Sequence, residues 1–233
     1  MRTYRPYTHR GARFRICCDA FKAVTEEIAR QRRTLDGYLR RHPRFQRSLE
    51  PLDAHPGAPE VARRMARAGR LAGVGPMAAV AGAMAQMAAE AGLAGGAPEA
   101  IVENGGDIYL VAEAPVTVSL YAGDTPLAGR LAFSVQPEET PLGICSSSGI
   151  MGRSFSFGRC DLATVVATDA ALADAAATKA GNLVKTADDI DPALRDIMQV
   201  EGVSGALLVK DDRVGMIGRL PKLVKLDGAA PAG

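Results

Sequence analysis

The sequence contains no tryptophan, and aromatic residues make up only 5% of its 233 residues. A hydrophobic core must therefore be built from Ala, Val, Leu, Ile and Met. The supply is sufficient, because 47% of the residues are hydrophobic and 23% are charged, as in an ordinary globular protein. This length allows one large domain or two small fused ones.

Cysteine and histidine are too few and too scattered for a disulfide framework or a zinc site. The four cysteines, Cys17, Cys18, Cys145 and Cys160, form no C-x-x-C pair, and all three histidines lie in the first quarter of the chain. Reduced thiols, as in the cytoplasm, are the expected state. Cys17 and Cys18 are adjacent on a predicted strand, so their side chains should point to opposite faces of the sheet.

Long runs of strongly apolar residues are also missing. The first 15 residues are basic and polar, so we expect no signal peptide or membrane anchor and a cytoplasmic protein. The longest weakly polar stretch, 73–89, consists mainly of Ala, Gly and Met and is short for a membrane span. We expect it to form a buried helix. Its small residues would serve equally well in a subunit interface, which leaves a homo-oligomer open.

Charge is unevenly distributed along the chain. Residues 1–70 carry ten more basic than acidic residues, the remainder carries eight more acidic than basic ones, and the whole chain is at +2. The basic part could attract a phosphate-bearing ligand or nucleic acid. Solvated faces of arginine-rich helices are the commoner reason for such a surplus, so nucleic-acid binding is not expected.

Hydrophobic periodicity and turn residues predict strands and helices in mixed order. The predicted strands cover 3–9, 13–18, 100–102, 108–111, 116–121, 130–135, 164–167, 205–210 and 214–218, and the predicted helices cover 21–41, 60–72, 77–92, 170–183 and 191–200. Hairpins rather than βαβ units favour an α+β fold with antiparallel sheet. We expect a single domain over 1–226, connections at 44–59 and 143–158, and a disordered tail at 227–233.

Three segments carry residues suited to chemistry. In the first, Gly73-Val74-Gly75-Pro76 leads into a helix, whose unpaired N–H groups form a natural anion site. Close packing of a small-residue helix would explain the same glycines. The second is Asn104-Gly105-Gly106-Asp107, which is either a tight hairpin stabilised by its own Asp or a backbone that passes close to a planar or phosphate ligand.

The third segment joins a Ser/Gly-rich loop to a helix. Ser147-Ser148-Gly149 lies in the loop, and Asp174 and Thr178 follow at i and i+4 of the helix, on one face. With a substrate phosphate and water, a carboxylate and a hydroxyl can hold magnesium. Alternatively, Thr178 hydrogen-bonds the main chain and Asp174 faces solvent.

Taken in order, the motifs G-x-G-P-M-A-A-V-A-G, E-N-G-G-D-I-Y, S-S-G-x-x-G-x-S-x-S-F-G and L-A-D-A-A-A-T-x-x-G-N resemble the uncharacterised-protein-family branch of the ApbE superfamily. The FAD:protein FMN transferases belong to that superfamily. The resemblance implies a duplicated T-fold, with antiparallel sheets backed by helices. It also implies that Asp174 and Thr178 bind magnesium beside the pyrophosphate of FAD or another flavin or nucleotide.

Under the same resemblance, N–H groups of Gly75 and of Ser147, Ser148 and Gly149 would contact phosphate. The ligand would pack against the turn that Asn104, Gly105, Gly106 and Asp107 form. The implied chemistry is cleavage or transfer at a diphosphate, where a metal stabilises charge.

Two elements of the FMN transferases are missing, which leaves open whether the chain is an enzyme. No Lys occurs in 73–96, and no H-x-x-D-P-x-T-G segment precedes the helix of Asp174. We therefore expect FMN transfer to be weak or absent. The alternative is a non-catalytic accessory protein, for which the resemblance suggests sulfur assimilation or homocysteine synthesis. Cys145 or Cys160 would then handle sulfide as thiolates, unless both are small core residues.

Overall fold

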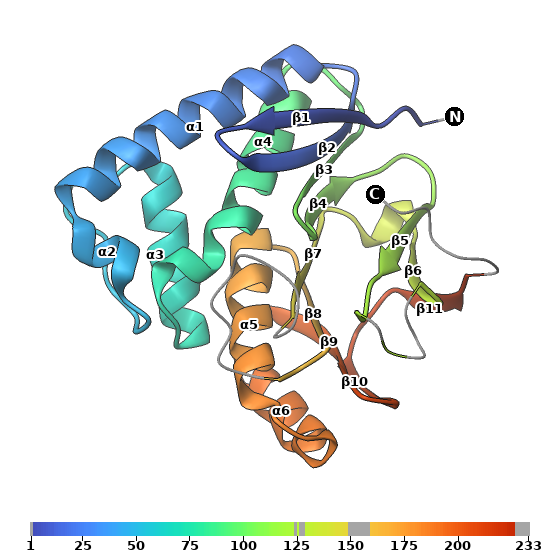
Figure 1. The fold of residues 1–233 in the computed structure, drawn as a ribbon. Helices are drawn as coiled ribbons and strands as arrows, with labels where there is room; N and C mark the ends of the chain where they lie inside the picture. The colour runs from blue at the N-terminus through green and yellow to red at the C-terminus, as the bar shows by residue number, and fades with distance from the viewer. Residues whose placement is uncertain (1, 124, 126–128, 149–158, 227–233) are drawn as a thin grey trace.

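Two sheets and a layer of helices make up the fold (Figure 1). The computed structural model describes residues 2–123, 125, 129–148 and 159–226. The larger sheet contains β1 (Arg5–His9), β2 (Ala12–Cys18), β3 (Ala100–Asn104), β4 (Asp107–Val111), β7 (Leu142–Ser147), β8 (Leu162–Ala167), β9 (Val203–Lys210) and β10 (Arg213–Gly218). The smaller sheet contains β5 (Val116–Leu120), β6 (Leu131–Val135) and β11 (Lys222–Lys225).

Most of the helices lie in two segments of the chain, one between β2 and β3 and the other between β8 and β9. They are α1 (Phe21–Arg41), α2 (Pro43–Arg47), α3 (Glu60–Ala72), α4 (Val80–Ala94), α5 (Ala170–Leu183) and α6 (Ile190–Ile197). Short 3-10 turns cover Pro76–Ala79, Pro137–Glu139 and Ala187–Asp189.

The larger sheet repeats one chain path twice. β1 and β2 form a hairpin, helices including α1 and α4 follow, and β3 and β4 form a second hairpin. β7 and β8, helices α5 and α6, and β9 and β10 repeat this order. All neighbouring strands are antiparallel and follow chain order, and β4 pairs with β7 where the halves meet. The predicted α+β fold with a duplicated strand–helix–strand unit is confirmed.

The two faces of the larger sheet have different covers. Helices α1, α4 and α5 pack on one face, and the smaller sheet lies over part of the other (Figure 1). Each face has its own hydrophobic core. Cys18 belongs to the core under the helices and Cys17 to the core on the opposite face, so the prediction that their side chains diverge is confirmed.

Helix α4 is largely buried, as its composition predicts. Of the residues from 75 to 92, eleven are buried, seven are half-buried and none is exposed. The helix packs against α1, α5, β3 and β4. Within the described part of the chain, Pro76–Ala94 is the one helical stretch long and apolar enough to cross a membrane, and half of its most apolar window is buried inside the protein. Pro76 begins a 3-10 turn, and the α-helix itself begins at Val80.

Several elements differ from the sequence prediction, among them β11, which was not predicted. The expected loop over 143–158 is wrong at its start, since Leu142–Ser147 is the central strand β7. Gly143 suggested a loop, but it is needed for close packing inside the strand. A Cβ at Gly143 would lie 2.7 Å from Cα of Ala170 on α5. The connection predicted over 44–59 begins within α2, and α6 covers Ile190–Ile197 rather than the predicted 191–200. Residues 149–158 and the tail 227–233 lie outside the described residues.

Candidate functional site

The hairpin of β3 and β4 brings two polar side chains together near the seam, the place where β4 of the first half pairs with β7 of the second half. Gly105 and Gly106 have φ values of 66° and 105°, which suit glycine, and they form the two-residue turn. Asn104 and Asp107 are paired across this turn, and both side chains are buried. Asn104 Nδ2 donates a hydrogen bond to the Ala81 carbonyl over 3.3 Å, so the turn is tied to the start of α4.

Asp174 reaches the same point from the second half. It lies on α5, and its Oδ2 accepts a hydrogen bond from the Gly82 N–H over 2.9 Å. Gly82 is the third residue of α4, where an N–H has no partner within the helix. The carboxylate therefore takes the place that an anion would otherwise take at this helix N-terminus.

Asp107, which is buried, and Asp174, which is half-buried, form an interacting pair of carboxylates. Burial is the main cause that raises the pKa of each one, and the charge of Asp174 raises the pKa of Asp107 further. Hydrogen bonds from Gly82 N–H to Asp174 and from Ser146 N–H to Asp107 Oδ1, the latter over 3.3 Å, partly oppose this effect. Over the ranges that the structure describes, neither carboxylate forms an ion pair with Lys or Arg. The pair consequently carries repulsion that a proton or a cation would relieve.

The pair suits a hard divalent cation such as magnesium. Two carboxylates are about as many protein ligands as Mg²⁺ takes, and ligand phosphate and water supply the other oxygens. Within the described residues, no group of three or more His, Cys, Asp or Glu side chains could hold a metal alone. A metal at this pair would therefore need a ligand to complete its coordination.

The other residues that the sequence singled out are distributed around this pair. Thr178 is one turn further along α5 and half-buried, and no hydrogen bond in the described part links it to either carboxylate. Gly75 packs closely against the main chain of Ser48 and Leu49. An added Cβ would be 2.9 Å from Leu49 Cα and closer still to the Ser48 carbonyl. Close packing thus accounts for Gly75, which is not among the residues of the cleft described next.

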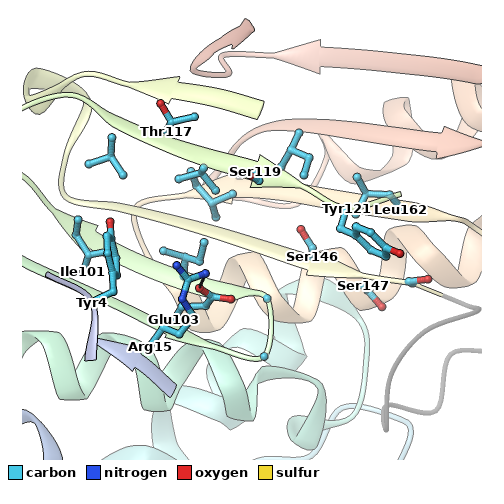
Figure 2. A pocket seen from close by; sticks show the side chains of 18 residues that line it. Tyr4, Arg15, Ile101, Glu103, Thr117, Ser119, Tyr121, Ser146, Ser147 and Leu162 are labelled. Atoms are coloured by element: carbon cyan, nitrogen blue, oxygen red, sulfur yellow. Dashed lines mark hydrogen bonds and ion pairs between the residues drawn. The ribbon is translucent and has the colours of Figure 1, made fainter. Parts of the chain in front are cut away.

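A cleft of about 360 Å³ opens on the face of the sheet opposite the helices (Figure 2). β5 forms one wall, and β3, β4, β7 and β8 form the floor. Gly105, Gly106, Ser147 and Ser148 line its end near the carboxylate pair, while Gly149 lies outside the described residues. The sheet thus separates two compartments, with the predicted glycines and serines on the cleft side and the carboxylates on the helix side.

Sequence reasoning missed most of the cleft. Arg15 and Glu103, paired on the neighbouring strands β2 and β3, form a 3.2 Å ion pair in the cleft, and Tyr4 and Tyr121 lie at its sides (Figure 2). Ser146 lines the cleft and shares a 2.9 Å hydrogen bond with the buried Thr164 of β8. These residues come from four separate strands and from the positions next to β1 and β5, so no local motif contains them. Period-two alternation would place Glu103 on the face opposite Asn104, which is the one available signal.

Comparison with known proteins agrees with this architecture. A family model described as "AbpE bacteria" matches residues 15–209. A UPF0280 protein of Methanocella arvoryzae is 45% identical over 200 residues, which cover 86% of this chain and 81% of the relative. A UPF0280 protein of Methanosarcina acetivorans is 41% identical over 207 residues, covering 88% and 81%. This chain belongs to the UPF0280 family of ApbE-like proteins.

Solved structures extend the likeness of this UPF0280 protein to the flavin transferases at the level of the fold. A mutant of the flavin transferase ApbE from Vibrio cholerae has a TM-score of 0.59 at 12% identity and covers 94% of this chain and 97% of its own. The apo form of the flavinyl transferase ApbE from Pseudomonas stutzeri has a TM-score of 0.53 at 10% identity, covering 94% of both chains. The ApbE-like fold that the motifs imply is confirmed.

Proposed function

We propose that this protein binds a phosphate-bearing small molecule, flavin-like or nucleotide-like, together with magnesium at the Asp107–Asp174 pair. The observation that carries the proposal is the placement of the two carboxylates. They come from different halves and interact where the halves meet: Asp107 accepts from the Ser146 amide beside the glycine turn, and Asp174 accepts from the Gly82 amide of α4.

Side chains would bind the cation, and the glycine turn would leave room for the ligand. Asp107 and Asp174 would hold the cation, and Thr178 is a further oxygen one turn away on α5. The main chain at Gly105 and Gly106 allows close approach of a ligand, because neither carries a side chain. When bound, the cation would neutralise phosphate charge, as required for cleavage or transfer at a diphosphate. We also propose that the protein is cytoplasmic and that its partner is a diffusible small molecule rather than a membrane or a nucleic acid.

Isothermal titration of ADP, FMN and FAD, each with and without magnesium, tests the proposal. At least one of these ligands should bind in a magnesium-dependent manner. Asp107→Asn and Asp174→Asn should each weaken that binding more than tenfold, because a cation then loses one of two charged ligands. Asp188→Asn is the matched control, since Asp188 is exposed and pairs only with Arg213 in the described structure. Equal binding by the wild type and both site variants would refute the metal site.

The accessory role based on reactive cysteines receives no support from the geometry. Cys145 and Cys160 are both fully buried in the core under the helices. Burial raises the pKa of the Cys145 thiol, and the neighbouring Asp107 and Asp174 raise it further. Burial also raises the pKa of Cys160 to about 12. Neither side chain is a thiolate at neutral pH, so the small-core-residue interpretation fits both.

A further inference from the structure

Asn104 lies beside the proposed metal site without facing the cleft. Its neighbours Glu103, Gly105 and Gly106 line the cleft, whereas Asn104 itself is buried on the helix side and does not. Its amide donates instead to the carbonyl of Ala81, in the first turn of α4. A buried amide with a single hydrogen bond to another element ties those two elements together.

The next residue of α4 carries the contact onward. The N–H of Gly82 holds Oδ2 of Asp174 at 2.9 Å. Gly82 is also pressed against α5: an added Cβ would lie 2.9 Å from Asp174 Cβ and closer still to the Ala170 carbonyl. The first turn of α4 therefore has little freedom to move relative to Asp174. Anything that shifts this turn shifts the hydrogen-bond donor that orients the carboxylate.

We infer that Asn104 is a positioning residue, which orients Asp174 through the first turn of α4 and does not touch the ligand itself. The inference rests on the proposed function for its consequence in metal binding. Its structural part stands on the two hydrogen bonds alone. Partners that orient a metal ligand from outside the coordination sphere typically change metal affinity by 10–100-fold.

The first test needs no metal. In Asn104→Leu, hydrogen exchange of the Gly82 amide should accelerate at least tenfold, and its ¹⁵N chemical shift should move in the same direction as in Asp174→Asn. Gln31→Met is the matched control, because Gln31 is another buried amide with one side-chain hydrogen bond among the described residues, to Glu27 on α1. It should lower the melting temperature without changing the Gly82 amide. Unchanged exchange of Gly82 in a folded Asn104→Leu would overturn the inference.

The second test measures Mn²⁺, as a probe of the magnesium site, by electron paramagnetic resonance titration in the presence of ADP. Asn104→Leu should weaken Mn²⁺ binding by 10–100-fold, and Gln31→Met should leave it unchanged. If Asn104→Leu does not unfold cooperatively, Asn104→Ala, which removes the amide without inserting a branched apolar side chain, takes its place. Should Asp174→Asn weaken Mn²⁺ binding while the Asn104 variant does not, the positioning role is wrong and the metal site stands. If the wild type binds no Mn²⁺ but Gly82 still responds, the metal site is wrong and the positioning role stands.

Discussion

The main-chain N–H of Gly82 donates a 2.9 Å hydrogen bond to the carboxylate of Asp174, so a helix of the first half is capped by a side chain of the second. Gly82→Ala should destabilise the protein. Strain from the new Cβ against Ala170 and Asp174 costs about 1–3 kcal/mol, which exceeds the helix-propensity gain of roughly 1 kcal/mol. Urea unfolding measures the difference. Gly37→Ala in α1 is the control: its nearest neighbour would be 3.9 Å away, and a gain of about 0.5–1 kcal/mol is expected.

Stability of the metal-free protein should fall as pH rises through the slightly acidic to neutral range. The pKa values of Asp107 and Asp174 are raised in the folded state, so the folded protein retains protons that the unfolded chain has already released. The loss begins above the ordinary aspartate pKa of about 4 and ends above the folded pKa values. Asp107→Asn should flatten this part of the profile, measured by urea unfolding at several pH values. A parallel decline in wild type and Asp107→Asn would contradict the interpretation, and Asp188→Asn should follow the wild type.

Covalent transfer of FMN to protein should be weak or absent. Two elements found in the FMN transferases are missing: no Lys occurs between residues 73 and 96, and no His follows residue 55. The measurement is in-gel flavin fluorescence after incubation with FAD, magnesium and a flavin-acceptor domain. An ApbE flavin transferase serves as the positive control. Robust flavinylation by this protein would show that neither missing element is essential.

None of the four cysteines should react readily in the native protein. All four are buried, and burial raises the pKa of each thiol. Iodoacetamide at pH 7.5 should modify them only after denaturant is added, as seen by intact mass. Cys17 and Cys18, at 8% and 6% exposure, should precede Cys145 and Cys160 when denaturant is increased. Rapid alkylation of Cys145 in the native protein would reopen a role in thiol chemistry.

Local chemistry made much of the architecture predictable. Pro43 ends α1, Pro76 opens the turn before α4, and Gly105 with Gly106 supplies the positive φ values of a tight hairpin. Each of these effects acts within a few residues, so it can be recognised in the letters alone. The Ala-, Gly- and Met-rich composition of α4 likewise predicts burial, since Gln86 and Glu90 are the only polar side chains on this helix.

β7 shows where local chemistry is insufficient. Its Gly and Ser residues are typical of a loop, yet it is the central strand that joins the halves. Gly143 is needed because α5 approaches the strand there, and the serines lie at the strand's end beside the cleft. The partner that creates each requirement comes from a distant segment, so the sequence around β7 does not contain it.

The sequence by itself determined the hairpins, most helix boundaries and the residue types available for chemistry, because steric preference and periodicity are short-range. Only the tertiary structure decided that the carboxylates of Asp107 and Asp174 interact. It also decided that Asn104 points to α4 rather than to the cleft, and that a carboxylate caps the N-terminus of α4. Those relationships depend on which strands pair at the seam between β4 and β7 and on how closely α4 packs on α5. Long-range packing sets both, and nothing within either segment encodes its distant partner.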